Sequence, residues 1–497
     1  MIVIIASIAL TALFLWITSK IVAVLSSPLN AIPNAHITAP FSRLWLLWIR
    51  ARGVEFSTHL AAHRRLGPVI RIGPREISID CIKDGVRTVY GGNWDKSSLY
   101  DNFTQFGFSP LFAIRQAKPH SERKRVFTHI YLKSTIMNSP ELAVLLTTIG
   151  QDRLLPRLQR ATKEGKDVDV YSLTREYSMD VVTTYVYGMK NGTNWVEYPN
   201  QASHYLSAFQ HAVEPWAFFA STEIQRLVSI FGWFGINLLS PSVNRAFDTI
   251  HSFVLDLTVR TIGTLENNHS SENGSMNTFR DVWQRLENVP EEQKTHLLAS
   301  DMVDQIHAGH EATGIVLTYL MWELSRNTEV QDRLRNELRS LSEPRSSELL
   351  DAVLMETIRL YPAGFGPFPR VAPDNAKVKG FDIPKGTIAT ASPYTLGRNT
   401  KIFPRAESWI PERWLDADDA EKRQMRQWVW MFMSGARNCI GEHLAVLAMK
   451  AFVVDIYSNY RTIITGNPNM SQLETFFSIP ANGSLNLKFE VVSKRQI

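Results

Sequence analysis

The spacing of hydrophobic residues predicts a chain that is mainly α-helical, with a smaller β part. Through most of residues 121–341 the apolar positions recur every three or four residues, as they do on the buried face of a helix. One such helix contains Leu334 and Leu338, and Thr328 with Gln331 forms a candidate capping box at its start.

Shorter segments with the composition of β-strands lie far apart in the sequence. Residues 69–73 (VIRIG) and 76–80 (EISID) flank a Pro-Arg turn and predict a pair of strands. A second strand-rich piece covers residues 376–392, and a polar stretch at residues 267–277 predicts a surface connection. Because the β pieces come from distant segments, we expect one large α+β domain rather than two domains in series.

The N-terminus carries no charge up to residue 19 and stays apolar to Leu25. About 20 apolar residues span a bilayer as a helix, so residues 1–26 are predicted to be a single-pass transmembrane signal anchor. A cleaved signal peptide would begin with basic residues, which are missing here. Positive charges follow the segment, which places the rest of the chain in the cytosol. Three prolines mark a predicted linker at residues 27–45, before a domain at residues 46–497.

Residues 216–239 are strongly apolar and aromatic. The favoured interpretation is a core segment. The alternatives are a surface that dips into a membrane or the lid of an apolar substrate site. Two charges inside the segment, Glu223 and Arg226, argue against a second membrane span.

Charge and cysteine content narrow the function classes. The 497 residues have a net charge of +5 without a long run of Lys or Arg. This fits an anionic membrane surface or an acidic partner, and argues against a nucleic-acid partner, which would require a concentrated basic stripe. Two cysteines provide no disulfide framework.

One of the two cysteines, Cys439, lies in the stretch FMSGARNCIG. An apolar pattern with helical spacing follows it, and the N-terminus of a helix favours thiolate over thiol. Gly435 and Gly441 allow close approach of backbone N–H groups or a positive φ, and Arg437 adds a cation for an anionic ligand. A zinc site would need further ligands, a cysteine hydrolase would need a base, and an inert buried cysteine would leave the glycines unexplained. Haem iron with one axial thiolate fits best, because one protein ligand suffices.

The same stretch resembles the haem-binding loop of the cytochrome P450 superfamily. Phe432, Gly435, Arg437, Cys439 and Gly441 match it at every defined position. The resemblance implies a P450 fold, haem b (iron protoporphyrin IX) as cofactor, and Cys439 as the axial iron ligand.

A second match is the helical segment LLDAVLMETIRLYP, in which Glu356 and Arg359 lie one turn apart. On sequence alone such a pair is most often solvated and contributes little. The family resemblance implies instead a buried triad with Arg413 of the stretch Pro-Glu-Arg-Trp, where Trp414 replaces the usual phenylalanine. The triad would hold the cysteine loop and take no part in the chemistry.

A third match is HAGHEATG, inside a predicted helix. A glycine there costs about 1 kcal/mol relative to alanine, so Gly309 indicates a ligand close by, a local bulge or a crowded core. Ala308, Gly309, Glu311 and Thr313 match the family pattern that crosses the oxygen-binding face of haem. The resemblance implies that Thr313 donates a hydrogen bond to dioxygen and that Glu311 relays protons.

Two further matches concern the haem propionates. Arg370 of FPRVAP lies where the family has a propionate-binding arginine, and HSERKR resembles the helix that supplies other propionate contacts. His120 would replace a tryptophan there, and Lys124 an arginine, with loss of the bidentate fork. A solvated basic face is the alternative for this second segment.

Together these matches predict a monooxygenase of the filamentous-fungal type, anchored in the endoplasmic reticulum membrane. It would use O2 and electrons from a separate NADPH-cytochrome P450 reductase, docked near Lys422, Arg423 and Arg426. The apolar segments favour a lipophilic substrate such as a terpenoid, polyketide or alkaloid of secondary metabolism. The alternatives are a haem-thiolate isomerase or dehydratase that needs no reductase, and a haem-binding protein without catalysis.

Overall fold

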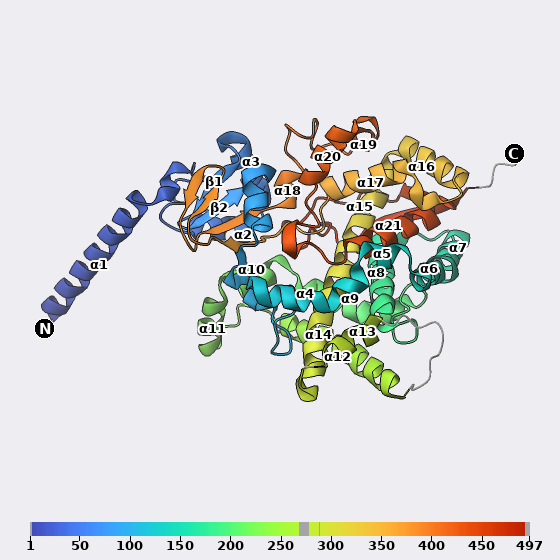
Figure 1. Ribbon diagram of the computed structural model, residues 1–497, viewed down its shortest axis with the longest axis horizontal. Helices are drawn as coiled ribbons and strands as arrows, with labels where there is room; N and C mark the ends of the chain where they lie inside the picture. The colour runs from blue at the N-terminus through green and yellow to red at the C-terminus, as the bar shows by residue number, and fades with distance from the viewer. Residues whose placement is uncertain (1, 268–277, 288, 493–497) are drawn as a thin grey trace.

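A continuous run of helix from Glu291 to Arg326 crosses the middle of the protein (Figure 1). It consists of α14 (Glu291–His307), one wide π-helical turn, η6 (Ala308–Ala312), and α15 (Thr313–Arg326). Helix α8 (Val170–Tyr187) packs along η6 and α15, and all of its residues except Ser172 are buried. The largest hydrophobic core surrounds this run, so the run is fixed on several sides.

The computed structural model describes residues 2–267, 278–287 and 289–492. The predicted polar connection therefore lies outside the described residues, except for its first residue. The other helices and helical turns are α1 (Ile2–Leu25), η1 (Pro28–Ala31), α2 (Leu44–Ala51), α3 (Glu55–Leu66), η2 (Ile82–Gly91), η3 (Ser98–Phe103), α4 (Ala117–Tyr131), α5 (Lys133–Met137), α6 (Pro140–Thr147), η4 (Thr148–Leu154), α7 (Leu155–Lys163), η5 (Pro199–Gln201), α9 (Ser203–Ala212), α10 (Pro215–Glu223), α11 (Gln225–Trp233), α12 (Pro241–Asn267), α13 (Thr278–Arg285), α16 (Thr328–Ser340), η7 (Pro344–Ser346), α17 (Glu348–Leu360), α18 (Pro393–Leu396), α19 (Glu412–Asp416), α20 (Asp419–Trp428), η8 (Gly435–Arg437) and α21 (Glu442–Tyr457).

The strands form a smaller part of the fold, as predicted. Their bounds are β1 (Val69–Gly73), β2 (Glu76–Ile79), β3 (Asp95–Lys96), β4 (Val168–Asp169), β5 (Arg370–Val371), β6 (Ala376–Val378), β7 (Phe381–Ile383), β8 (Ile388–Ala391), β9 (Tyr460–Ile464) and β10 (Asn486–Val491). They make a five-stranded sheet in the order β1-β2-β8-β5-β3, a three-stranded sheet in the order β4-β10-β9, and the pair β6-β7.

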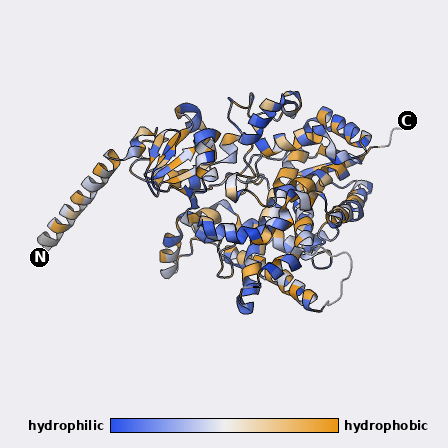
Figure 2. Ribbon diagram, viewed as in Figure 1, coloured by the Kyte–Doolittle hydropathy of each residue, from blue (hydrophilic) through white to orange (hydrophobic). Residues whose placement is uncertain are grey.

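The predicted hairpin is confirmed, because β1 and β2 pair antiparallel with Val69 opposite Ile79. Strand β8 then adds parallel to β2, with Glu76 opposite Ile388. All residues of β1 and β2 are buried, and both strands are mainly apolar (Figure 2). Burial on both faces is the reason that these strands lack an alternating pattern.

Helix α1 projects away from the rest of the protein (Figure 1). Within the part of the chain that the structure describes, no helix combines the length and the apolar character needed to cross a bilayer. The N-terminal anchor therefore stays a prediction.

The residues predicted as a linker pack against the domain instead of forming a free tether. Leu29, Ile32 and Ala39 are buried, and the Ala35 amide donates a hydrogen bond to the carbonyl of Arg71 in β1 at 2.9 Å. Packing therefore begins well before residue 46.

The apolar segment at residues 216–239 divides between two environments. Three residues of α10 are buried, but α11 contains no buried residue. Trp233 is 85% exposed and Phe234 is 77% exposed. The core interpretation is therefore wrong for the second half of the segment, which forms an exposed apolar surface.

Candidate active site

The loop that contains Cys439 connects α20 to α21 and turns sharply at Gly435. The φ of Gly435 is +77°, and a Cβ at this position would lie 2.4 Å from the carbonyl oxygen of Tyr90. Only glycine fits both conditions. The Cys439 amide then donates to the carbonyl of Phe432 at 2.8 Å, which closes the loop. Because α21 begins at Glu442, the cysteine lies just before the N-terminus of a helix, as predicted.

The electrostatics of the Cys439 sulfur are unfavourable for a free thiolate. Burial raises its pKa to about 11, although the backbone N–H groups of Gly441 and Glu442 point at the sulfur and act in the opposite direction. At neutral pH the group is therefore a thiol, unless a cation bound to the sulfur replaces the proton. The residue nevertheless keeps accessible surface and lines a cavity.

This cavity has a volume of about 430 Å³ and lies between the cysteine loop and the central helical run. Ala308, Gly309, Ala312 and Thr313 line it on the helical side. Aromatic side chains make up much of the remaining wall. They are Phe103, Phe112, Tyr131, Phe209, Phe218, Phe247, Phe368, Phe432, Phe476 and Phe477.

One corner of the cavity gathers positive charge. Lys96, Lys124 and Arg437 line it together with a neutral His120, and Arg370 lies close enough to act on the pKa values of Lys96 and His120. Burial and the neighbouring cations hold the pKa of Lys96 well below its usual value and lower that of His120 to about 3. Burial and Arg370 lower the pKa of Arg437 to about 10.

Few carboxylates compensate these cations. Asp95 lies 3.7 Å from Arg437 but is half exposed, and burial raises the pKa of Asp304 to about 8, so that it is mostly neutral at pH 7. A buried cluster with excess positive charge is stabilised only when an anionic ligand enters. The corner is therefore an anion-binding site next to a thiol.

Comparison with known proteins agrees with this geometry. The family model described as Cytochrome P450 matches residues 41–487. The chain belongs to the cytochrome P450 family. P450 enzymes bind haem b through a cysteine thiolate, and this chain is a P450 monooxygenase.

Similar proteins include fungal and mammalian P450 enzymes. The cytochrome P450 monooxygenase FGM1 of Gibberella zeae is 25% identical over 457 residues, which cover 86% of each chain. The fusicoccadiene 8-ol C-16 hydroxylase of Alternaria brassicicola is 25% identical over 480 residues, or 92% of this chain and 91% of that protein. The lithocholate 6-beta-hydroxylase of Mesocricetus auratus is 26% identical over 392 residues, or 73% of each chain.

The residues of this P450 fit haem b. The Cys439 thiol is one candidate ligand, and a Cβ at Gly441 would meet no protein atom within 4 Å, which leaves open space beside the sulfur. Haem b also carries two propionate carboxylates, which match the excess of cations in the corner. Among the described residues, no three His, Cys, Asp or Glu side chains form a cluster that could hold a metal ion instead.

The residues expected at the oxygen-binding face of haem lie on two different faces of the helix. Thr313 and Ala308 line the cavity. Glu311 does not line it and is fully buried on another face, where its Oε1 accepts a hydrogen bond from the Tyr171 hydroxyl at 2.5 Å. Arg175 lies 3.7 Å from its Oε2.

Gly309 has two of the three predicted explanations at once. It lies inside the wide turn η6, which is a local bulge of the helix. A Cβ at Gly309 would lie 2.8 Å from Cγ2 of Val182 in α8, so core crowding also demands glycine. The glycine therefore brings the helical run close to α8 while its backbone borders the cavity.

The residues expected to bind the haem propionates differ in how close they lie to the cavity. Lys124 contacts the cysteine loop, where its Nζ donates to the Ala436 carbonyl at 3.0 Å and to Asn438 Oδ1 at 2.8 Å. Arg370 is buried and donates to the Tyr100 hydroxyl at 2.9 Å. His120 lines the cavity directly.

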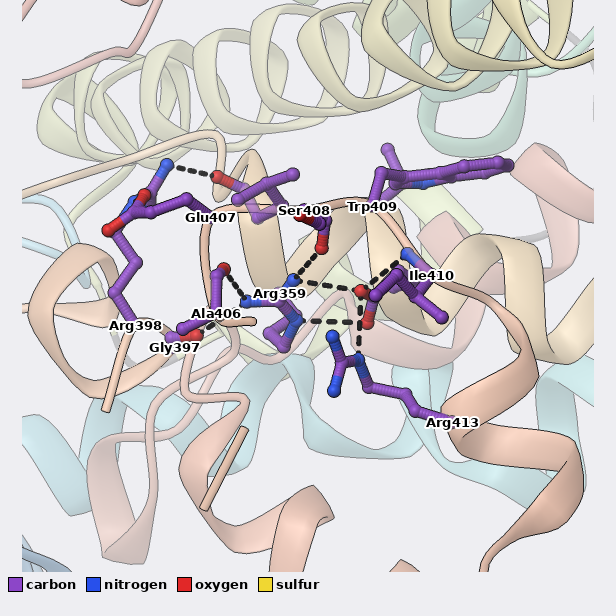
Figure 3. Close-up of polar contacts among 12 residues, drawn as sticks. Arg359, Gly397, Arg398, Ala406, Glu407, Ser408, Trp409, Ile410 and Arg413 are labelled. Atoms are coloured by element: carbon purple, nitrogen blue, oxygen red, sulfur yellow. Dashed lines mark hydrogen bonds and ion pairs between the residues drawn. The ribbon is translucent and has the colours of Figure 1, made fainter. Parts of the chain in front are cut away.

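The structure also brings Glu356, Arg359 and Arg413 together, away from the cavity (Figure 3). Two nitrogens of Arg359 donate to the two oxygens of Glu356 at 2.8 and 2.9 Å, and Arg413 Nε donates to Oε1 at 3.0 Å. Arg359 also donates to three backbone carbonyls, those of Gly397, Ala406 and Ser408. One buried guanidinium thus connects α17 to the segment that precedes α19.

Trp414, the departure from the family pattern, joins the same cluster. Its indole N–H donates to Oε2 of Glu356 at 2.9 Å, a bond that phenylalanine could not make. The Ile410 amide donates to Oε1 at 2.9 Å. The carboxylate therefore has a full set of donors, which is the condition for a buried charge to be tolerated.

Two features of the site were missed from the sequence. Lys96 belongs to the cation corner, but no motif marks it. Asp301 and Asp304 of α14 accept the backbone amides of Leu111 and Phe112, both at 2.8 Å, and so hold that loop over the cavity. Asp301 also pairs with Arg123 of the basic segment, so that residue is not simply solvated.

Replacing Arg359 by alanine is expected to abolish haem retention and to lower the free energy of unfolding by about 3–5 kcal/mol, because Glu356 would stay buried without its main partner. The measurements are haem absorbance per polypeptide and urea unfolding.

A matched control is Arg333→Ala. Arg333 pairs with Glu412 at 2.8 Å, but their side chains are 45% and 35% exposed, so the expected change is about 0–1 kcal/mol. Normal haem content in the Arg359 variant would contradict a role of the triad in holding the haem loop.

Proposed function

We propose that this P450 inserts one oxygen atom from O2 into a lipophilic small molecule, with electrons from NADPH delivered by a separate reductase. The observation that supports this most is the composition of the cavity. Its wall combines Cys439 and Thr313 with a largely apolar lining that is rich in aromatic rings. A site of this kind accepts an apolar substrate close to the haem position and excludes bulk water.

When bound, haem supplies the reduction and activation of O2. The chain contributes the environment. Cys439 supplies the sulfur ligand, and its loop amides at Gly441 and Glu442 stabilise negative charge there. Lys96, Lys124 and Arg437 would hold the propionates, which fixes the orientation of the ring.

We assign the supply of protons to bound O2 to two residues of the central helical run. Thr313 presents a hydroxyl to the cavity, where it can donate a hydrogen bond to O2. Burial raises the pKa of Glu311 above its ordinary value, so this carboxyl carries a proton more readily than an exposed one. Transfer to the cavity would use a rotation of the side chain or an intervening water.

The apolar lining supports a terpenoid, polyketide or alkaloid substrate. Two similar proteins are named for hydroxylation of a fusicoccadiene alcohol and of lithocholate, both large and mainly hydrocarbon. A fungal secondary-metabolite pathway agrees with the fungal relatives at 25% identity.

Purified holoprotein, reduced and exposed to carbon monoxide, is expected to show the long-wavelength Soret band of thiolate-bound haem, and Cys439→Ala is expected to lose it. With a P450 reductase, NADPH and ¹⁸O2, a lipophilic substrate should gain one labelled oxygen atom.

The same assay distinguishes a monooxygenase from the two alternative functions. A haem-thiolate isomerase or dehydratase would convert its substrate without NADPH and without ¹⁸O in the product. Intact haem with no turnover of any substrate would favour a non-catalytic haem protein.

The basic residues of α20 are the proposed reductase contact. Arg423 and Arg426 are exposed and Lys422 is half-buried, and this hydrophilic helix leads directly into the cysteine loop (Figure 2). Reductases with an acidic docking face would be attracted there.

Reversing the charge of Arg423 and Arg426 to Glu is expected to raise the KM for reductase by about 10-fold, because encounter between the proteins depends on complementary charge. The carbon monoxide spectrum should not change. Lys385→Glu, an exposed site at the turn between β7 and β8, is the control. Equal changes in both variants would contradict docking at α20.

Membrane association in the endoplasmic reticulum is proposed for the N-terminal side. Residues 1–19 carry no charge. Exposed apolar side chains of α11 include Trp233, and those near α2 include Phe41 and Trp48. Glu223 of α10 pairs with Arg50 of α2 at 2.6 Å, which keeps these two surfaces together.

The full chain is expected to stay in the membrane pellet after alkaline carbonate extraction, and a variant without residues 2–26 should be released, because about 20 apolar residues suffice to hold a bilayer. Retention of the haem spectrum in the shortened protein is the control for folding. Release of the full chain under the same conditions would exclude the anchor.

A further inference from the structure

Two adjacent residues of the wide turn η6, His310 and Glu311, are both fully buried. Their side chains approach each other, with Nε2 of the imidazole 3.6 Å from Oε2 of the carboxyl group. Neither of these two atoms has a hydrogen-bond partner. Buried polar atoms without a partner are rare in folded proteins, because each of them costs free energy. The two atoms are therefore candidates to satisfy each other.

The tautomer of His310 follows from the contact of its other ring nitrogen. Nδ1 lies 2.8 Å from the carbonyl oxygen of Ile306, one turn earlier in the helix. A carbonyl oxygen only accepts hydrogen bonds, so Nδ1 carries a proton. Burial, together with the nearby His307 and Arg175, holds the pKa of the ring well below its usual value, so the ring is neutral. Nε2 is therefore a bare acceptor that needs a donor.

The carboxyl group of Glu311 is that donor when it carries a proton. Its Oε1 already accepts from the Tyr171 hydroxyl, which leaves Oε2 as the place for the proton. Burial raises the pKa of the group above its ordinary value. Arg175 of α8 faces it but lies 3.7 Å from Oε2 and makes no hydrogen bond to it. Tyr205 of α9 lies close enough to act on it electrostatically, and its hydroxyl is uncharged.

The two other charge states of this pair fit less well. A carboxylate beside the neutral ring would place two acceptors 3.6 Å apart with no proton between them. An imidazolium beside a carboxylate would require a positive charge on His310, which burial and the neighbouring Arg175 oppose. A neutral acid beside a neutral ring supplies one donor for one acceptor.

We propose that Glu311 is held as a neutral acid whose proton, on Oε2, is hydrogen-bonded to Nε2 of His310. A small rotation of the carboxyl group shortens the 3.6 Å gap to hydrogen-bond length. His310 is thus a positioning residue, which keeps the acid protonated while the acid faces away from the cavity. This inference rests on the proposed function and deepens it, since Glu311 is the residue expected to supply protons to bound O2. When the proton leaves, the O–H bond breaks and the carboxylate that remains faces Arg175.

The test observes this proton directly, by infrared absorption of the purified holoprotein. A protonated carboxyl group has a carbonyl stretch above the amide bands, and this stretch shifts in D2O. The unchanged protein is expected to show such a band at neutral pH, and Glu311→Gln is expected to lose it. The difference between the two spectra separates Glu311 from other buried acids such as Asp304.

Variants at His310 test the partner of the proton. His310→Phe has no acceptor but keeps a ring against Phe209, whose centre lies 4.7 Å from that of the imidazole. A hydrogen bond to the neutral acid raises its pKa, so without that bond the band should move to higher frequency. As the pH rises, it should also disappear about one pH unit lower than in the unchanged protein. His310→Gln offers an amide oxygen as acceptor and should restore part of both effects. His310→Leu, which also lacks an acceptor, replaces the phenylalanine variant where that variant retains no haem.

His129→Phe is the matched control. Nε2 of His129 lies 3.6 Å from Oδ2 of Asp281, the same separation, but the Asp281 side chain is 45% exposed. This variant should leave the Glu311 band unchanged.

The proposal is overturned if Glu311→Gln loses no band, if the variants at His310 without an acceptor leave the band unchanged, or if His129→Phe changes it equally. These outcomes are distinct from failure of the proposed function, because haem content, the carbon monoxide spectrum and ¹⁸O incorporation are measured on the same protein preparations.

Discussion

The whole site depends on one electrostatic constraint, a thiol on the wall of an apolar cavity, shielded from bulk water, beside a cluster of cations. Burial raises the pKa of Cys439 to about 11 and holds that of Lys96 well below its usual value, so both groups are destabilised in their charged forms. A single molecule with a cation at its centre and carboxylates at its edge relieves both conditions. Haem b has this distribution of charge, and the cavity between the cysteine loop and the central helical run is where it would act. The cofactor is thus part of the balance of forces in the fold.

A second buried charge, the carboxylate of Glu356, is satisfied within the protein. Glu356 accepts hydrogen bonds from Arg359, Ile410, Arg413 and Trp414. Arg359 in turn binds three carbonyls of the segment that precedes α19. These contacts join α17 to the chain that leads into α20 and the loop. The two buried clusters differ in one respect: the Glu356 carboxylate has donors for both of its oxygens, whereas the cations beside Cys439 have few carboxylate partners.

The sequence predicted the parts of the site that short motifs encode. The loop at Cys439 and the Glu356–Arg359 spacing are local patterns, because backbone turns and helical periodicity place their residues. Contacts between distant segments were not predictable in this way. Lys96 enters the cation corner through the pairing of β3 with β5. Gln331 is not a capping residue; it is buried and bonds the Leu324 and Thr462 carbonyls, so tertiary contacts replaced the local motif. The exposure of α11 also depends on what packs nearby, which composition does not encode.

The central helical run holds part of the cavity wall and a buried carboxyl within one turn of the same backbone. Thr313 and His307 line the cavity on the two sides of the wide turn η6, and Glu311, inside that turn, faces α8 instead. A Cβ at Gly309 would lie 2.8 Å from Cγ2 of Val182, so the glycine lets the run pack directly against α8. The face of the turn opposite the cavity is held by the contacts of Glu311 with Tyr171 and Arg175. The cavity wall and the Glu311 contacts therefore share one short stretch of backbone whose position is set by packing against α8.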